Sequence, residues 1–183
     1  MRVISGAARG RKLTLPKAAN FINPTSDRVK EAIFDIIQFD IEGRRTLDLF
    51  TGSGQLGIEA LSRGARSVSF VDERQEALDI ARANVELCKS AFPDAVYNFY
   101  RSDAILFLKR NEKYDLVLLD PPYMTNLTPR ALETIITVDK VTIGGIIVCE
   151  SFQAHGQMAG YSLKSYKYGR TNVTVYTKKD EAS

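Results

Sequence analysis

Residues 52–57 read GSGQLG, which matches the G-x-G-x-x-G pattern of loops that bind dinucleotide cofactors. A carboxylate, Asp48, stands four residues before the first glycine. Nicotinamide and flavin cofactors place a negatively charged pyrophosphate at such a loop, and a nearby carboxylate repels it. The glycines therefore predict a ligand that lies close to the backbone, whereas Asp48 disfavours a dinucleotide as that ligand.

Aspartates also mark the ends of three further segments that the sequence pattern predicts as strands. They are Asp72, Asp103 and Asp120. The carboxyl ends of parallel strands meet at one edge of a sheet, so these carboxylates and Asp48 are expected to surround one site. Unit charges about 4 Å apart interact by roughly 4 kcal/mol at an effective dielectric constant of 20. The site therefore favours a cofactor that is cationic and has no phosphate, and S-adenosylmethionine meets both conditions.

Two of these aspartates have a structural alternative. Asp72 and Asp103 each precede a predicted helix and could cap its N-terminus. Asp72 also lies 20 residues after Gly52, where a ribose-binding acid belongs in either cofactor class. Helix capping accounts for neither Asp48 nor Asp120.

The segment LLDPPY, residues 118–123, has the composition of a site for an exocyclic amine. Pro121 and Pro122 fix two φ angles and remove two backbone donors, so their carbonyl groups face outward. Asp120 and the Pro121 carbonyl then offer two acceptors for the two amine hydrogens, and Tyr123 offers a ring on which a nucleobase can stack. A rigid proline turn after a buried strand is the structural alternative. We favour the functional interpretation because of the glycine loop upstream.

Alternating strands and helices are expected to position these residues. Strands are predicted at 45–50, 67–72, 96–101, 114–120 and 144–150, and helices at 54–63, 74–88, 104–110 and 128–136. An earlier helix begins near Thr25 or Ser26, and residues 161–179 form two strands with a turn at Gly169-Arg170. This order predicts an α/β, Rossmann-like fold with a seven-stranded, mostly parallel sheet and one antiparallel strand.

The first 24 residues are predicted to be a basic extension of the domain formed by residues 25–183. RVISG and RKLTL, separated by Gly6 and Gly10, indicate a small β-hairpin. Residues 1–30 hold seven basic side chains and one acidic side chain, whereas the whole chain has a net charge of +3. Such an arm suggests a polyanionic partner, and on charge alone a solvated tail is an equal alternative.

The rest of the composition argues against several kinds of site. One histidine, His155, and two cysteines in apolar surroundings, Cys88 and Cys149, give no metal motif and no histidine-based triad. MRVISGAARG lacks the apolar core of a signal peptide, and the longest apolar stretch is too short to span a bilayer. We therefore expect a cytoplasmic protein without a metal, and a monomer because no segment predicts an oligomer.

DLFTGSGQLGIEAL and LVLLDPPY together resemble the class I S-adenosylmethionine-dependent methyltransferases that act on exocyclic amines. Three further segments restrict the resemblance to a smaller group within this class: RVISGAARGRKL, PTSDRVKEAIF and YGRTNVTVY. From Arg2 to Lys178 the chain resembles the RsmD-type 16S ribosomal RNA (guanine-N2) methyltransferases. The resemblance implies methyl transfer from S-adenosylmethionine to the N2 amine of a guanine in 16S rRNA, either naked or within an assembling small ribosomal subunit.

The resemblance also assigns roles to residues. Those expected to bind the cofactor are Thr25, Arg28, Asp48, Gly52, Gly54, Asp72 and Asp103, with Gly57 allowing the next helix to pack closely. Those that match the target-amine motif are Asp120, Pro121, Pro122 and Tyr123, and the basic arm residues expected to hold RNA phosphates are Arg9, Arg11 and Lys12. For Arg28, an ion pair with Glu31 on the same helix is an equal alternative.

Three other functions stay open. An adenine-N6 DNA methyltransferase uses the same D-P-P-Y chemistry, although 183 residues leave no separate DNA-recognition domain. A nicotinamide-dependent oxidoreductase is disfavoured by Asp48, and a non-catalytic RNA-binding protein by the intact acceptor motif. Residues 151–162, SFQAHGQMAGYS, are either a substrate-contacting loop or a shortened connection, and we favour the shortened connection.

Overall fold

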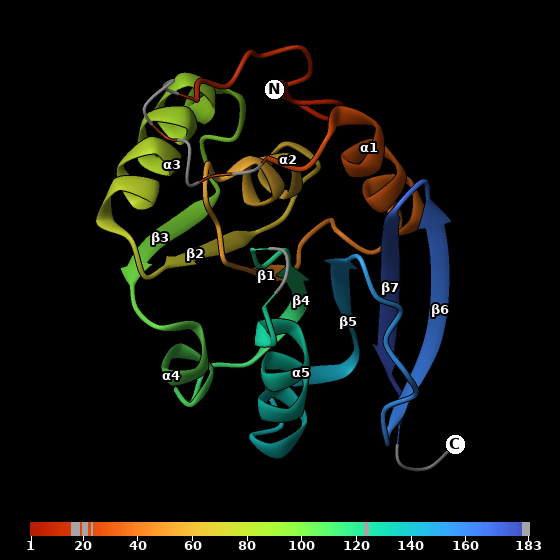
Figure 1. Ribbon diagram of the computed structural model, residues 1–183. Helices are drawn as coiled ribbons and strands as arrows, with labels where there is room; N and C mark the ends of the chain where they lie inside the picture. Colours follow the sequence, from red (N-terminus) through yellow and green to blue (C-terminus); the bar gives the residue numbers. More distant parts are fainter. Residues whose placement is uncertain (16–18, 20–21, 23, 123–124, 181–183) are drawn as a thin grey trace.

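A computed structural model describes residues 1–15, 19, 22, 24–122 and 125–180. In this part of the chain, strands form one mixed sheet in the order β3-β2-β1-β4-β5-β7-β6 (Figure 1). The strands are β1 Arg45–Leu49, β2 Ser67–Asp72, β3 Val96–Arg101, β4 Tyr114–Leu119, β5 Val141–Ser151, β6 Tyr161–Tyr168 and β7 Thr171–Lys178. Neighbours from β3 to β5 pair in parallel, and β7 is antiparallel to both β5 and β6. The predicted seven-stranded α/β sheet is confirmed.

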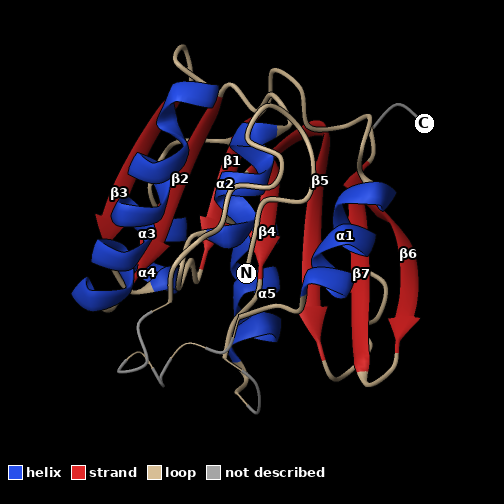
Figure 2. Cartoon of the chain, turned by 90° about the horizontal axis from the view of Figure 1, so that it is seen from above, coloured by secondary structure: helices blue, strands red, loops and turns tan. Residues whose placement is uncertain are grey.

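Helices cover both faces of this sheet (Figure 2). They are α1 Asp27–Ile36, α2 Gln55–Ser62, α3 Gln75–Cys88, α4 Ala104–Leu108 and α5 Leu127–Thr137, with a short 3-10 turn at Lys89–Ala91. Buried residues of α1, α2 and α3 share one apolar cluster, and those of α4 and α5 share another. Along β4, Leu116 and Leu118 enter the first cluster, while Val117 and Leu119 enter the second. Buried strands therefore read as continuous apolar runs, because both of their faces are covered.

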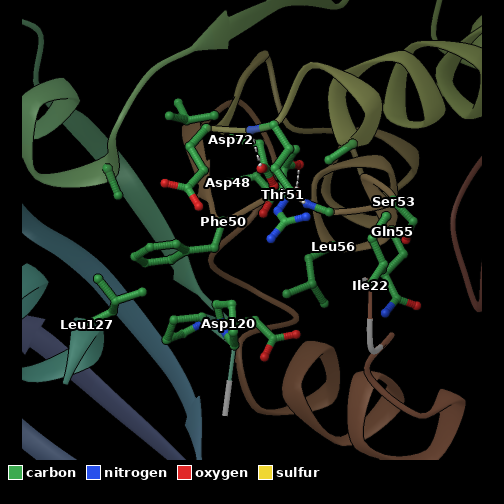
Figure 3. Close-up of a pocket in the computed structure, with 18 of the residues that line it drawn as sticks. Ile22, Asp48, Phe50, Thr51, Ser53, Gln55, Leu56, Asp72, Asp120 and Leu127 are labelled. Carbon is green, nitrogen blue, oxygen red and sulfur yellow. Dashed lines mark hydrogen bonds between the residues drawn. The ribbon is translucent and has the colours of Figure 1, made fainter. Parts of the chain in front are cut away.

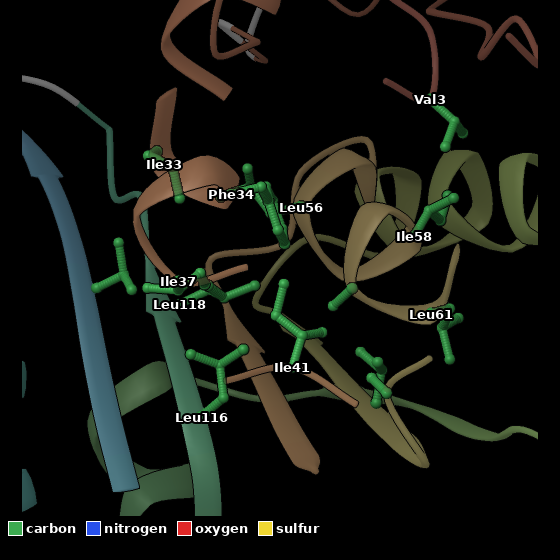
Figure 4. Close-up of a cluster of buried hydrophobic side chains, with 14 of the residues drawn as sticks. Val3, Ile33, Phe34, Ile37, Ile41, Leu56, Ile58, Leu61, Leu116 and Leu118 are labelled. Carbon is green, nitrogen blue, oxygen red and sulfur yellow. The ribbon is translucent and has the colours of Figure 1, made fainter. Parts of the chain in front are cut away.

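The α1 helix packs closely on the sheet near the site. Ser26 is its N-cap, as predicted, and the Ser26 hydroxyl accepts a hydrogen bond from the Val29 amide. Ile33, Phe34 and Ile37 then face Leu118 and its neighbours in the first cluster (Figure 4). This spacing of three and four residues puts the apolar side chains on one side of the helix. The helix thereby holds the segment that precedes it, which includes Thr25, over the end of β4.

The predicted N-terminal hairpin is wrong, because the described residues contain no strand before β1. Pairing is limited to one antiparallel bridge between Arg2 and Lys12. The amides of Ile4 and Ser5 bond to the Glu59 carboxylate on α2 instead, at 2.8 and 2.9 Å. An antiparallel ladder uses every second amide: the Val3 amide donates to the Arg11 carbonyl, so the next donor would be Ser5, and its bond to Glu59 removes it from the ladder. The Val3 carbonyl accepts from the Gly10 amide, which closes a turn and does not extend the pairing. The segment is therefore a loop fastened to α2.

Cys88 and Cys149, which stand in apolar surroundings in the sequence, are buried free thiols. No helix among the described residues is long and apolar enough to cross a membrane.

Candidate active site

The loop between β1 and α2 is organised around the carboxylate of Asp48. Its Oδ2 accepts a hydrogen bond from the Thr51 hydroxyl at 2.7 Å and another from the Gly57 amide at 2.9 Å. Burial raises the pKa of Asp48 to about 7, against the opposing effect of these two donors and with a further increase from the charge of Asp72. A buried carboxyl of this kind ionises more readily when a cation lies beside it.

Backbone conformation directs the same loop toward the end of the sheet. Gly52 and Gly54 have φ angles of 51° and 79°, in the left-handed region that glycine adopts without strain. Phe50 has a φ of 73°, a rare conformation for a residue with a side chain. The amides of Phe50 and Thr51 both donate to the carbonyl of Val71 on β2, which holds this conformation. The glycines stand out in the sequence, whereas no sequence pattern marks the conformation of Phe50.

Gly57 is needed because the helix lies very close to the sheet. A β-carbon at this position would stand 2.3 Å from a ring atom of Phe70 and 2.9 Å from Oδ2 of Asp48. Only glycine allows the amide of residue 57 to reach the Asp48 carboxylate.

Asp72 and Asp103 stand at the ends of the neighbouring strands. Asp72 accepts hydrogen bonds from the amides of Gly52 and Arg74, each at 3.0 Å, and so joins β2 to the glycine loop. It is not the N-cap of α3, since Arg74 has that position. Asp103 is the N-cap of α4, where it accepts from the Leu106 amide at 2.9 Å. The capping alternative therefore describes Asp103, although this residue also lines the cavity described below.

Asp120 follows β4 and is held from the α1 side. Its Oδ2 accepts a hydrogen bond from the Thr25 hydroxyl at 2.5 Å. Burial and the nearby carboxylates of Glu150 and Asp48 raise the pKa of Asp120 well above its ordinary value, with Thr25 opposing the increase. Glu150 is buried near the end of β5, where the pairing of Leu119 with Cys149 brings the ends of β4 and β5 together. Asp120 is therefore more basic than an exposed aspartate.

Gln55 joins the glycine loop to the segment before α1. Its Nε2 donates to the carbonyl of Thr25 at 3.2 Å, and its Oε1 is buried and has no hydrogen-bond partner in the described part of the chain. Neither Gln55 nor Glu150 was identified from the sequence. Glu150 carries the same signal as the aspartates, an acid at the carboxyl end of a predicted strand, whereas Gln55 stood out only as a polar residue within the glycine pattern.

These elements surround a cavity of about 200 Å³ at the carboxyl ends of the strands (Figure 3). The charged residues that line it, among those the structure describes, are five acids and one base: Asp48, Asp72, Glu73, Asp103, Asp120 and Arg74. Ile22, Phe50, Leu56 and Leu127 supply apolar surface. Among the described residues, no group of acids, cysteines or histidine could hold a metal ion.

The chemistry of this lining fits S-adenosylmethionine. An excess of carboxylates suits a cofactor with a sulfonium and an ammonium group, and the buried Oε1 of Gln55 is an acceptor with no partner among the residues that the structure describes. The cavity also has apolar walls for an adenine ring. A pyrophosphate would meet the same carboxylates unfavourably.

Other residues singled out from the sequence lie apart from the cavity. Arg28 is exposed on α1 and does not line it, and no described ion pair joins Arg28 to Glu31. Arg9, Arg11 and Lys12 are exposed on the N-terminal loop. The Ala7 and Ala8 amides bond to Ser62 at the last residue of α2, so Arg9 lies at the far end of that helix from Gly54. Pro121 and Pro122 line the cavity, whereas Tyr123 lies outside the described residues.

Comparisons with known proteins identify the family. The family described as Conserved hypothetical protein 95 matches residues 1–177. The chain belongs to this family.

Relatives of this chain and a similar solved structure are named as methyltransferases or putative methyltransferases. A Bacillus subtilis protein named "Putative rRNA methyltransferase YlbH" is 38% identical over 190 residues, which cover 98% of this chain and all of that protein. "Ribosomal RNA small subunit methyltransferase D" of Haemophilus influenzae is 36% identical over 135 residues, 72% of this chain and 68% of the relative. A solved structure titled "Putative methyltransferase yhhF from Escherichia coli" has 27% identity and a TM-score of 0.85, with 98% of each chain covered.

The fold and the family agree about the chemistry. The sheet order is that of a class I methyltransferase, and the protein is an S-adenosylmethionine-dependent methyltransferase of the RsmD and YlbH type. The expectation drawn from Asp48 and the other strand-end acids, a cationic cofactor in place of a dinucleotide, is confirmed.

Proposed function

We propose that the protein transfers a methyl group to the exocyclic N2 amine of a guanine in 16S ribosomal RNA. The Haemophilus influenzae relative is named a small-subunit rRNA methyltransferase and the Bacillus subtilis relative a "Putative rRNA methyltransferase", and these names support RNA as the substrate. The proposal depends most on the position of Asp120. Its carboxylate accepts a hydrogen bond from Thr25, and it is followed by two prolines at the edge of the acidic cavity. An amine acceptor thus lies beside a site for a cationic methyl donor.

The cofactor would be held by the glycine loop and the strand-end acids. Asp48, Gly52 and Gly54 would lie at its methionine portion, Asp72 at its ribose and Asp103 at its adenine. When bound, S-adenosylmethionine supplies an electrophilic methyl group on its sulfonium. Thr25 would act through Asp120 and Gln55, both of which it contacts. The exposed position of Arg28 supports no direct contact with the cofactor.

Asp120 would orient the amine and then accept its proton. A guanine extruded into the cavity offers two N–H donors, and the Asp120 carboxylate and the Pro121 carbonyl are the acceptors for them. The amine becomes acidic only as its new bond to carbon forms, so its proton can leave late. The raised pKa of Asp120 favours that transfer, since a more basic carboxylate is a better proton acceptor.

The N-terminal segment, residues 1–24, would contribute contacts to RNA phosphates. Arg9, Arg11 and Lys12 are exposed, and the loop that carries them is fastened to α2 by Glu59 and Ser62. A fixed array of cations loses less conformational entropy on binding than a flexible tail does. This supports a role in binding over a purely solvated arm.

Adenine-N6 methylation of DNA is the alternative, because it uses the same acceptors. The test is a methylation assay with unmodified 16S rRNA, small ribosomal subunits and duplex DNA, with the modified base identified by mass spectrometry. N2-methylguanine in the RNA is the expected product. N6-methyladenine in the DNA, with unmodified RNA, would contradict the proposal.

Asp120→Asn tests the role of the carboxylate. We expect kcat to fall by about 10²-fold or more, the usual contribution of a positioned proton acceptor. The affinity for S-adenosylhomocysteine, measured by calorimetry, should change by less than about threefold. Asp94→Asn is the matched control, because Asp94 is exposed in the turn before β3. Full transfer by Asp120→Asn would rule out this mechanism.

A further inference from the structure

A long acid-free stretch follows the active-site strand β5. Residues 151–179 contain five Lys or Arg side chains and no Asp or Glu, although the chain has 22 acidic residues. This stretch forms β6, β7 and the turn between them. Two of the five bases, Lys167 and Arg170, lie at the β6–β7 turn, whereas Lys178 at the other end of these strands pairs with Asp139. The two cations at the turn offer a polyanion a favourable surface, in contrast to the acidic lining of the cavity.

The β6–β7 turn lies at the same edge of the sheet as Asp120. Leu119 of β4 pairs with Cys149 of β5, so the residues that follow, Asp120 and Glu150, are adjacent. Ser151 pairs with Asn172 of β7, which places the start of β7 at this edge too. With strands about 4.8 Å apart and about 3.3 Å per residue, the backbone of Phe152 begins roughly 8 Å from that of Asp120.

A shallow hollow at this turn combines an aromatic ring with two cations. It is lined by Phe152, Lys167, Gly169, Arg170 and Asn172. The Phe152 residue is 42% exposed, and its carbonyl accepts a hydrogen bond from Nδ2 of Asn172 at 2.7 Å. Lys167 and Arg170 are exposed, and neither forms an ion pair with any residue that the structure describes. We define these three residues, Phe152, Lys167 and Arg170, as the turn surface.

We propose that the turn surface binds single-stranded RNA next to the target nucleotide. The ring of Phe152 stacks on a flanking base, and Lys167 and Arg170 hold phosphates on either side of it. Aromatic rings and cations together are the usual means of holding unpaired nucleotides without reading their sequence. This inference rests on the proposed function, since it takes the substrate to be RNA.

The turn surface complements the N-terminal loop in position. Arg9 lies at the end of α2 that is distant from the cavity, whereas the turn surface is at the cavity's own edge. Contacts close to the extruded base are the ones that fix its position for the reaction. The stretch 151–162, interpreted from the sequence as a shortened connection, thus supplies a substrate contact through Phe152.

The experiment measures binding of unmodified 16S rRNA by filter retention over a range of salt concentrations, with S-adenosylhomocysteine present. Lys167→Ala/Arg170→Ala should weaken binding and reduce the slope of log K against log salt by about 1.4, because two single-strand phosphate contacts are lost. Phe152→Leu should weaken binding about tenfold and leave the slope unchanged, while Phe152→Trp should keep wild-type affinity.

The matched control replaces two lysines that are distant from the turn surface. Lys109→Ala/Lys113→Ala removes two cations near the start of β4, at the opposite edge of the sheet, and should change the slope by less than about 0.5. Each variant must keep wild-type affinity for S-adenosylhomocysteine, which shows that it is folded. An unchanged slope in Lys167→Ala/Arg170→Ala, or unchanged affinity in Phe152→Leu, overturns the proposal.

Two further readouts separate this inference from the proposed function. A defect confined to protein-bearing subunits, with binding of naked RNA intact, overturns the inference, because the turn surface would then contact a ribosomal protein. A wild-type protein that binds rRNA but methylates neither RNA nor subunits overturns the proposed function, while the binding data still decide the role of the turn surface.

Discussion

At the scale of single residues, the basicity of Asp120 is set by residues distant in the sequence. Glu150 comes 30 positions later and Thr25 comes 95 positions earlier, and the two have opposite effects on the pKa of Asp120. A carboxyl accepts a proton only in its ionised form, so the rate should fall as the pH falls below the raised pKa. The acid limb of the pH profile therefore belongs at a higher pH than an ordinary aspartate would give.

Replacing Glu150 tests this account. In Glu150→Gln the negative charge that raises the pKa of Asp120 is removed, so the pKa falls. We expect the acid limb of kcat against pH to move down by about one unit, a differential interaction of about 1.4 kcal/mol. Single-turnover rates between pH 5 and pH 9 measure the shift.

A charge change elsewhere on the surface should not reproduce this effect. Glu133→Gln, at an exposed position on α5, is the control and should leave the profile unchanged. A Glu150→Gln profile that coincides with the wild type would show that the charge of Glu150 does not act on Asp120 during the reaction.

At the scale of elements, the β1–α2 unit ties cofactor binding to packing. The Gly57 amide reaches Asp48 only because α2 lies against Phe70 of β2. The same close approach fixes the turn that contains Gly52 and Gly54. Stability and cofactor affinity should therefore change together when this contact is disturbed.

Gly57→Ala is the direct test of that coupling. Its β-carbon would overlap the Phe70 ring, and relief of such overpacking usually costs about 1–3 kcal/mol. We expect a lower free energy of unfolding in urea and weaker binding of S-adenosylhomocysteine. Gly156→Ala is the control, since no atom lies within 4 Å of its added carbon. Equal stability of the two variants would mean that α2 can move away from the sheet without cost.

At the scale of the whole molecule, positive charge lies on two surfaces outside the acidic cavity, one distant from the cavity and one at its edge. The bases of the N-terminal loop lie over the face covered by α2, and the turn surface lies at the far strands of the sheet (Figure 1). An RNA that contacted both would cross the α1 side of the molecule. Binding to such a surface is expected to depend strongly on salt.

The N-terminal loop gives a separate prediction about that dependence. Arg9→Ala/Arg11→Ala/Lys12→Ala should lower the slope of log K against log salt by about 2, at roughly 0.7 per phosphate contact. Lys109→Ala/Lys113→Ala again serves as the control. An unchanged slope in the triple variant would identify the loop as a solvated structural segment that binds no RNA.

The amino-acid pattern alone was enough to predict the sheet and the class of cofactor. Apolar runs alternating with helical periods fix strand and helix positions locally, and acids at strand ends meet because parallel strands share an edge. Asp48, Asp72, Asp103 and Asp120 could therefore be selected together from sequence alone. Helix boundaries were less well determined: α5 begins at Leu127, before the predicted Thr128, because Asn126 takes the cap position.

The contacts of those residues follow from the packing of the elements. The Glu59 carboxylate takes the Ser5 amide from the predicted hairpin. Thr25, Gln55 and Glu150 lie beside Asp120 or its neighbours although they are distant from it in the sequence. Such contacts depend on how α1 and α2 pack on the sheet, and the local sequence patterns that predict helices and strands do not predict that packing. The physical reason is that periodicity encodes which face of an element is buried, whereas the partner of a polar group is fixed only when the elements come together.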